Sequence, residues 1–219
     1  MMPTTRSQAM RSLPPNIKVT FFSEEDLDMI FSYVAELATG KRRRNEHLRY
    51  LLLMKVLLRT GARVTEALLL KPTDIDFQVN TITLATLKKN IKDAEKLKPY
   101  QERKLPKRVL PLHPDLKDAL MSYFLELHID VKSGERIFPM ARQMVNRYMS
   151  RVQSGLTARG YKVKINPHKF RHTFAVKALF DGVPINVVQR WLAHSSLLVT
   201  SVYANILSMD TAGYMKQVR

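Results

Sequence analysis

Two arginines in this sequence lie in contexts that suit phosphate binding. Arg63 follows a glycine turn, within Thr60-Gly61-Ala62-Arg63, where a helix-like apolar stretch begins. Arg171 lies three residues after His168, so both side chains share one face of a predicted helix. A guanidinium near a helix start binds phosphate well, because the free backbone N–H groups there also favour an anion. Taken singly, Arg63 also fits a surface ion pair with Glu66, and the spacing of His168 and Arg171 could occur by chance.

Two residues further along the chain could supply a hydrogen-bond donor and a nucleophile. His194 follows an apolar, helix-like stretch and precedes two serines, which suits either an exposed donor or a helix-capping histidine. Tyr203 follows nine residues later, and alone it would be interpreted as a packing residue. His168 and Arg171 together could bind a phosphate and move a proton.

Other chemistries are poorly supported. The sequence has no cysteine, no glycine-rich phosphate loop and no helical zinc motif, which argues against a zinc site and nucleotide hydrolysis. Asp74 and Asp76 are too few for a two-metal nuclease and fit a turn before a strand. We therefore expect a site that uses no metal or other cofactor.

The elements that must position these residues are mostly helical. Apolar residues at helical spacing predict helices at 23–40, 48–60, 64–70, 114–127, 141–159, 168–180, 184–193, 196–203 and in the last 15 residues. Residues 81–84 alternate like a strand, and 109–112 can pair with them. The lysine-rich residues 88–108 between them predict an extended, mobile hairpin tip. The fold class is therefore mainly α with a small antiparallel β-sheet (α+β).

The composition indicates a polyanionic partner. The chain has 219 residues, 45% of them apolar, with 36 Lys and Arg against 19 Asp and Glu, a net charge of +17. Such an excess favours nucleic acid or an acidic membrane surface. No apolar run approaches the length of a membrane span. We expect a soluble, cytoplasmic protein.

Three phrases of the sequence resemble those of tyrosine recombinases, the phage integrase family. They are Thr-Gly-Ala-Arg-Val-Thr-Glu-Ala-Leu at 60–68, Pro-His-Lys-Phe-Arg-His-Thr-Phe-Ala at 167–175, and Leu-Ala-His-Ser-Ser with Thr-Ser-Val-Tyr between 192 and 203. The resemblance extends over about 21–203 and implies the catalytic-domain fold of that family, with a small three-stranded sheet.

The resemblance also implies a role for each residue of the site. Arg63 and Arg171 would neutralise the phosphate oxygens, and Tyr203 would attack phosphorus to form a covalent 3′-phosphotyrosine. His168 would exchange a proton with the tyrosine hydroxyl, and His194 would donate to the phosphate. Lys88, with Lys89 as the alternative, would protonate the leaving 5′-hydroxyl. Glu66, Asp74 and His172 would support the site without acting in the chemistry.

The expected organisation follows from the same resemblance. Residues 1–20 would form an N-terminal arm, 21–203 the catalytic domain, and 204–219 a tail that could be exchanged between protomers. The family works as a tetramer on double-stranded DNA. Most members carry a separate N-terminal DNA clamp, so this chain would be a short single-domain recombinase, receive the clamp from an accessory protein, or be a fragment.

The predicted activity is site-specific recombination of a mobile element or plasmid, by integration, excision, inversion or resolution. The alternatives are a nicking-closing enzyme of the type IB topoisomerase kind, an inactive recombinase-like DNA-binding protein, and a basic protein that binds RNA or membranes. The candidate DNA contacts are Arg42, Arg43, Arg44, Lys89, Arg147 and Arg151. For the basic run at 41–44, a solvated loop is the alternative interpretation.

Overall fold

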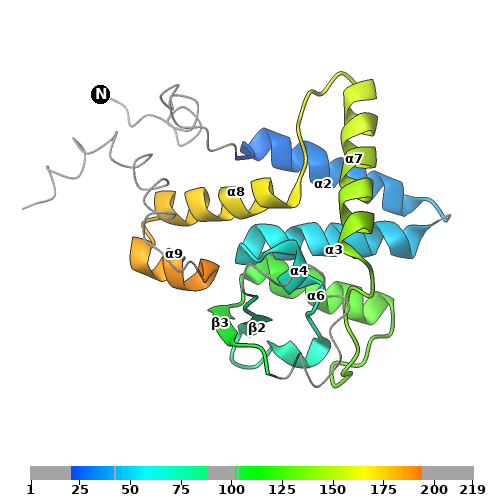
Figure 1. Cartoon of the computed structure of the whole chain (residues 1–219). Helices are drawn as coiled ribbons and strands as arrows, with labels where there is room; N and C mark the ends of the chain where they lie inside the picture. The colour runs from blue at the N-terminus through cyan, green and yellow to red at the C-terminus, as the bar shows by residue number, and fades with distance from the viewer. Residues whose placement is uncertain (1–20, 42, 88–101, 103, 194–219) are drawn as a thin grey trace, which may run out of the picture.

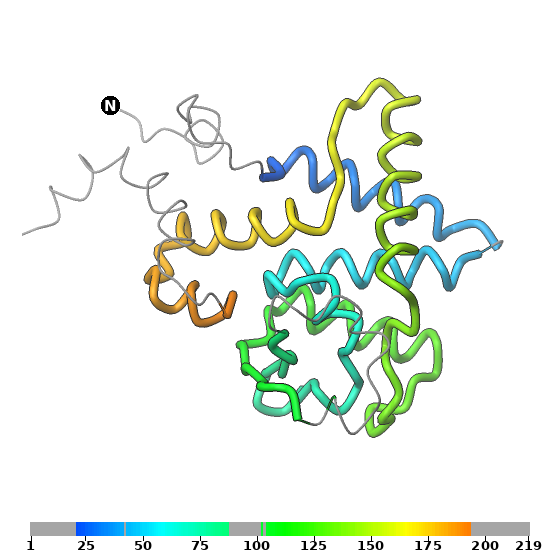
Figure 2. The backbone as a smooth tube through the Cα atoms, in the orientation of Figure 1, coloured from blue at the N-terminus to red at the C-terminus, as the bar shows by residue number. Residues whose placement is uncertain are grey.

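The structure is a computed structural model, and it describes residues 21–41, 43–87, 102 and 104–193 (Figures 1 and 2). Its elements in chain order are α2 (Glu24–Thr39), α3 (Arg44–Thr60), α4 (Val64–Ala67), the 3₁₀ helix η1 (Pro72–Asp74), β1 (Ile75–Asp76), β2 (Thr81–Ala85), β3 (Lys107–Pro111), α6 (Pro114–Glu126), α7 (Arg142–Ala158), α8 (Pro167–Phe180) and α9 (Ile185–Leu192).

Helix α3 is the centre of the fold. It packs against α2, α6 and α8, and in Figure 1 α7 crosses it. Residues 50–58 of this helix are apolar except for Lys55, and Leu53, Val56 and Leu57 are fully buried, which is the pattern expected of a helix segment enclosed on several sides. The end of this helix, next to Gly61, is therefore held rigidly, and Arg63 follows directly.

A three-stranded antiparallel sheet lies beside α4, with strand order β1-β2-β3. Ile82 pairs with Leu110 and Leu84 with Arg108, so the inward residues of β2 are buried while alternate residues are partly exposed. Helix α9 packs on β3 and on α8 (Figure 1). The sheet therefore contacts α4 through β2, and α9 contacts both the sheet and α8.

The structure confirms the mainly helical class, the predicted hairpin and most helix positions. The helix predicted at 64–70 is wrong beyond Ala67, where the chain continues in tight turns. Leu68, Leu69 and Leu70 are all buried, which one helix face cannot achieve, and Pro72 disfavours a helical Lys71. The predicted hairpin tip at 88–108 is wrong at its end, because Lys107 and Arg108 already belong to β3. Residues 88–101 and 103 of the tip, the helix at 196–203 and both terminal segments lie outside the described residues.

The helices are also unlike membrane spans. Among the described residues, none is both long enough and apolar enough to cross a bilayer.

Candidate active site

Gly61 forms the corner that brings Arg63 to the site. It ends α3 in the left-handed conformation, with φ of 61°, and its N–H donates to the Leu57 carbonyl. A Cβ at this position would lie 2.4 Å from the Phe174 ring of α8 and 2.6 Å from Leu192 of α9. Only glycine meets both demands, so this residue lets α3, α8 and α9 approach one another at the start of α4.

Arg171 joins the same three elements through its side chain. It is only 6% exposed. Its Nη1 donates to the Gly61 carbonyl at 2.5 Å, and its Nη2 donates to the Leu192 carbonyl at 2.6 Å. Hydrogen bonds to neutral carbonyl oxygens fix the guanidinium without cancelling its charge, so the positive group is preorganised.

His168 lies in the first turn of α8, one helical turn before Arg171. The Asn166 side chain caps this helix by accepting from the Lys169 N–H at 2.9 Å, and Pro167 occupies its first position. Burial, and then the positive charges of Arg142, Arg171 and Arg63, lower the pKa of His168 below its usual value. The imidazole is therefore neutral near pH 7 and able to accept a proton.

Glu66 is fully buried and organises the Arg63 side of the site. Its Oε1 accepts from Arg63 Nη1 at 3.0 Å and from the Leu87 N–H at 3.3 Å. Its Oε2 accepts from the Arg63 N–H at 3.0 Å and from Arg108 Nη2 at 2.8 Å. Burial opposes ionisation of Glu66, but Arg108 and Arg63 outweigh it and hold its pKa below the usual range.

The pair of Arg63 with Glu66 that the sequence suggested therefore exists, but it is not a surface pair. The Arg63 side chain is 30% exposed, whereas the Glu66 side chain is 0% exposed. The buried Glu66 carboxylate orients the Arg63 guanidinium, and the exposed part of that guanidinium remains open to an anion.

The structure thus brings together three of the six predicted site residues, Arg63, His168 and Arg171. The other three, Lys88, His194 and Tyr203, lie outside the described residues, as do Arg42 and Lys89. The described residues next to two of these segments are fixed by packing and hydrogen bonding: Leu87 is 5% exposed, and the Leu192 carbonyl accepts a hydrogen bond from Arg171.

Two predicted DNA contacts, Arg43 and Arg44, lie far from this site and are paired with carboxylates. They stand at the opposite end of α3, which is about 25 Å long for its 17 residues. Arg43 lies 3.8 Å from Glu46, and Arg44 pairs with Glu126. Arg44 is the first residue of α3 rather than part of a loop, and a contact of Arg43 or Arg44 with DNA stays a prediction.

Arg147 and Arg151 lie one turn apart on α7, and both are exposed. This helix contains no acidic residue, and no ion pair of either arginine is found within the described part of the chain. Nearby, the Tyr148 ring stacks on Tyr50 at 3.7 Å, which fixes α7 across α3. The two guanidinium groups are therefore available to an external anion.

Two further arginines near the site, Arg142 and Arg108, are not among the residues predicted from the sequence. Arg142 is exposed at the first position of α7, and its charge is felt by His168. Its place at a predicted helix start was a usable signal. Arg108 lies on β3, and nothing in a strand pattern distinguishes an arginine that turns inward from one in solvent.

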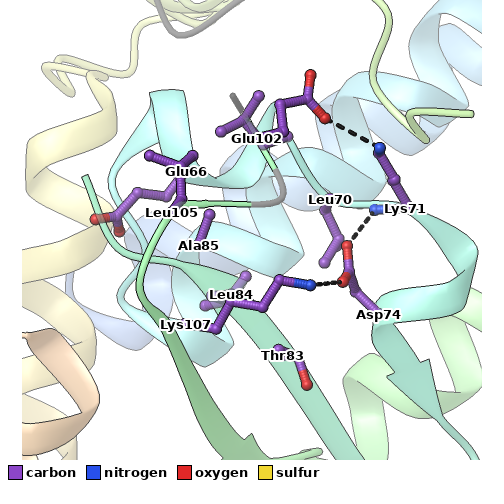
Figure 3. A pocket seen from close by; sticks show the side chains of 11 residues that line it. Glu66, Leu70, Lys71, Asp74, Thr83, Leu84, Ala85, Glu102, Leu105 and Lys107 are labelled. Carbon is purple, nitrogen blue, oxygen red and sulfur yellow. Dashed lines mark hydrogen bonds and ion pairs between the residues drawn. The ribbon is translucent and has the colours of Figure 1, made fainter. Parts of the chain in front are cut away.

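A cavity of about 70 Å³ lies beside Glu66, between the sheet and the turn after α4 (Figure 3). Lys71 bridges Glu102 at 3.0 Å, and Lys107 binds Asp74 at 3.2 Å, while Figure 3 shows the Glu66 carboxylate pointing away from this cluster. The cavity is too small for a substrate, so we interpret it as part of the hairpin base. In the described chain, no three His, Asp or Glu side chains gather as a metal site would require.

Comparison with known proteins identifies relatives of this arrangement. The model of the phage integrase family matches residues 21–209. The tyrosine recombinase XerC of Pediococcus pentosaceus is 29% identical over 197 residues, which are 85% of this chain and 58% of XerC. A resolvase of Escherichia coli is 29% identical over 182 residues, which are 75% of this chain and 69% of the resolvase. The match thus spans little more than half the length of that XerC.

Solved structures show the same fold. The XerA recombinase aligns with a TM-score of 0.60 at 22% identity, over 92% of this chain and 66% of XerA. The catalytic domain of bacteriophage HP1 integrase aligns with a TM-score of 0.54 at 21% identity, over 86% of this chain and 89% of that domain. The expected tyrosine recombinase catalytic-domain fold is therefore confirmed, and this chain belongs to the phage integrase family.

Proposed function

We propose that this chain is the catalytic part of a site-specific DNA recombinase that cleaves and rejoins strands through a 3′-phosphotyrosine. The convergence of Arg63, His168 and Arg171 at one corner of the fold carries the proposal. Two fixed guanidinium groups suit a phosphodiester, whose charge grows in the transition state. Relatives of the chain in the Xer group and a resolvase, and a XerH recombinase bound to its difH substrate, support DNA as the partner.

In the proposed reaction, the Tyr203 hydroxyl attacks phosphorus and loses its proton to neutral His168. A P–O bond forms to the tyrosine, the bond to the 5′-oxygen breaks, and Lys88 or Lys89 protonates the departing 5′-oxygen to give the 5′-hydroxyl. Arg63, Arg171 and His194 stabilise the charge on the phosphate. Attack by a 5′-hydroxyl reverses these steps and reseals the strand, so the bond energy is kept without a nucleotide cofactor.

We extend the proposal to the organisation of the active assembly. Residues 21–203 would form the catalytic domain, and 204–219 would contact a neighbouring protomer in a tetramer on DNA. Exposed Arg147 and Arg151 would contact DNA phosphates.

Covalent trapping tests the reaction class. We would incubate the protein, with chelator present, with DNA from its own genetic neighbourhood that is nicked so that the 5′-hydroxyl fragment diffuses away. We expect a protein–DNA adduct on a denaturing gel that is lost in Tyr203→Phe and retained in Tyr161→Phe, because Tyr161 is an exposed tyrosine outside the site. An adduct that survives in Tyr203→Phe contradicts the assignment, and DNA binding without any adduct favours the inactive alternative.

Substitution of Arg171 tests whether its charge serves the transition state. We expect Arg171→Ala to lower the cleavage rate by about 10²–10³-fold, the usual effect of removing one such donor, with little loss of DNA affinity. Single-turnover cleavage and a binding titration separate the two quantities. Arg171 also binds the Gly61 and Leu192 carbonyls, so its loss could unfold the site. Arg171→Lys, which keeps the charge, and a thermal unfolding curve of each variant therefore serve as controls. A large, uniform loss of binding would make Arg171 a phosphate anchor instead.

A further inference from the structure

Arg108 is a buried arginine whose guanidinium joins three elements around the site. Its side chain is only 9% exposed, and it extends from β3. Nε donates to the Trp191 carbonyl at 2.7 Å, and Nη2 donates to Glu66 Oε2 at 2.8 Å. Nη1 donates to the Ala85 carbonyl at 3.3 Å and to Thr86 Oγ1 at 3.1 Å. One planar group thus binds the end of β2, the end of α9 and the carboxylate that orients Arg63.

The partners of Arg108 lie directly before the two segments that carry other proposed site residues. Ala85 and Thr86 precede Lys88 by three and two positions, and Trp191 precedes His194 by three. In Figure 2, β3 and the end of α9 lie close together on the left of the view, in agreement with the hydrogen bond from Arg108 to the Trp191 carbonyl. Arg108 is therefore the shared anchor of both chain exits.

This linkage depends on the shape of the arginine side chain as well as on its charge. Glu66 has a second cation, Arg63, so neutralising its charge does not by itself require Arg108. The fork of N–H groups on a guanidinium reaches several acceptors in fixed directions, whereas a lysine ammonium is a point charge on a flexible stem. A lysine at 108 could keep the ion pair with Glu66 but could not hold β2 and α9 together.

We propose that Arg108 is a positioning residue that holds the end of β2 at a fixed distance from the end of α9, and so sets the spacing of the segments leading into Lys88 and His194. The inference rests on the proposed function for its catalytic consequence. The bridge itself is a property of the folded chain and can be measured without DNA.

Hydrogen exchange of the 219-residue chain without DNA tests the bridge. We expect Arg108→Lys to speed amide exchange about tenfold or more in peptides covering both 83–87 and 186–192, because both anchors loosen at once. Arg159→Lys is the matched control, since Arg159 pairs with Glu36 at the far end of α7. Unchanged exchange at either end in Arg108→Lys would overturn the proposal.

Cleavage kinetics test the consequence. On the nicked DNA, we expect Arg108→Lys to lower the single-turnover rate about 30-fold or more while the Kd changes less than about threefold, because misplaced groups slow chemistry more than binding. Arg108→Met should cleave at least as slowly as Arg108→Lys. If Arg108→Met does not fold, the result for Arg108→Lys alone decides the test. Full activity of Arg108→Lys overturns the positioning role. If the wild type itself forms no adduct, the proposed recombinase function fails, and the exchange result still decides the bridge.

Discussion

The arginines around Gly61 and those along α7 share a side chain but have opposite surroundings. Arg108 and Arg171 are buried, and their hydrogen bonds go to atoms of the protein itself. Arg142, Arg147 and Arg151 are exposed on a helix without an acidic residue. Burying a guanidinium is costly unless its donors are satisfied, whereas an exposed one costs little and remains free to meet an anion.

The two groups of arginines therefore have different roles, although both contribute to the net positive charge. The buried arginines fix where α3, α8, α9 and the hairpin meet, and in the proposed function Arg171 also stabilises the charge on the phosphate. The exposed arginines of α7 act outward, because a phosphate can replace the water around them. Removal of a buried arginine should therefore alter geometry and rate, whereas removal of an exposed one should alter affinity and its dependence on salt.

The largest expected effect follows from disturbing the buried corner at Gly61. Gly61→Ala should destabilise the protein by about 2–4 kcal/mol, because it adds a clash with Phe174 and Leu192 to a positive φ. Gly160→Ala is the control, since Gly160 also has a positive φ, of 90°, but a Cβ there would have no neighbouring atom within 4 Å. That variant should lose only about 1–2 kcal/mol. Urea unfolding measures both, and equal losses would mean that the close approach contributes nothing.

A smaller effect is expected from the exposed pair on α7. The double variant Arg147→Gln/Arg151→Gln should reduce the slope of log affinity against log salt by about 1.8, near 0.9 for each phosphate that is no longer neutralised. Fluorescence anisotropy on one duplex at several salt concentrations gives the slope. Arg159→Gln should leave it unchanged, because that arginine is engaged by Glu36. An unchanged slope in the double variant would remove α7 from the DNA interface.

The smallest effect concerns His168, whose pKa is lowered by burial and then by both exposed Arg142 of α7 and Arg171 of the buried corner. Arg142→Gln should raise the pKa of His168, because one of the charges that lower it is removed. With a lowered folded pKa, the native state resists protonation, so stability is lost as pH falls below about 6.5, the unfolded value. The substitution should weaken that loss. An NMR titration of His168 measures the shift, and no change would show that Arg142 lies too far away to act.

Much of the fold could be predicted from the sequence because its helices have strong apolar periodicity. The helices α2, α3 and α7, and the pairing of β2 with β3, follow from that pattern and from Gly61 and Ser23 as boundaries, whereas α8 is indicated by Pro167 at its start and Gly182 after its end. The stretch 68–70 failed because three consecutive leucines carry no period, and their burial depends on neighbours distant in sequence.

The candidate site divides in the same way. Arg63, His168 and Arg171 stand out through local context, since each lies at or near a helix start. Arg108 and the full burial of Glu66 were not predictable, because both depend on side chains meeting across β3, α4 and α9. Long-range polar contacts leave no spacing pattern along the chain, so a surface pair and a buried one look alike in sequence.

The attachment of Phe22 has a mechanical consequence. Its ring is fully buried, with its centroid 4.8 Å from that of Phe170, and the Lys169 ammonium lies 4.3 Å from the ring. Its N–H donates to Thr173 Oγ1 at 2.9 Å. Tension applied to the chain ahead of Phe22 would therefore reach α8, the helix that carries His168 and Arg171, as well as α2, which begins two residues after Phe22.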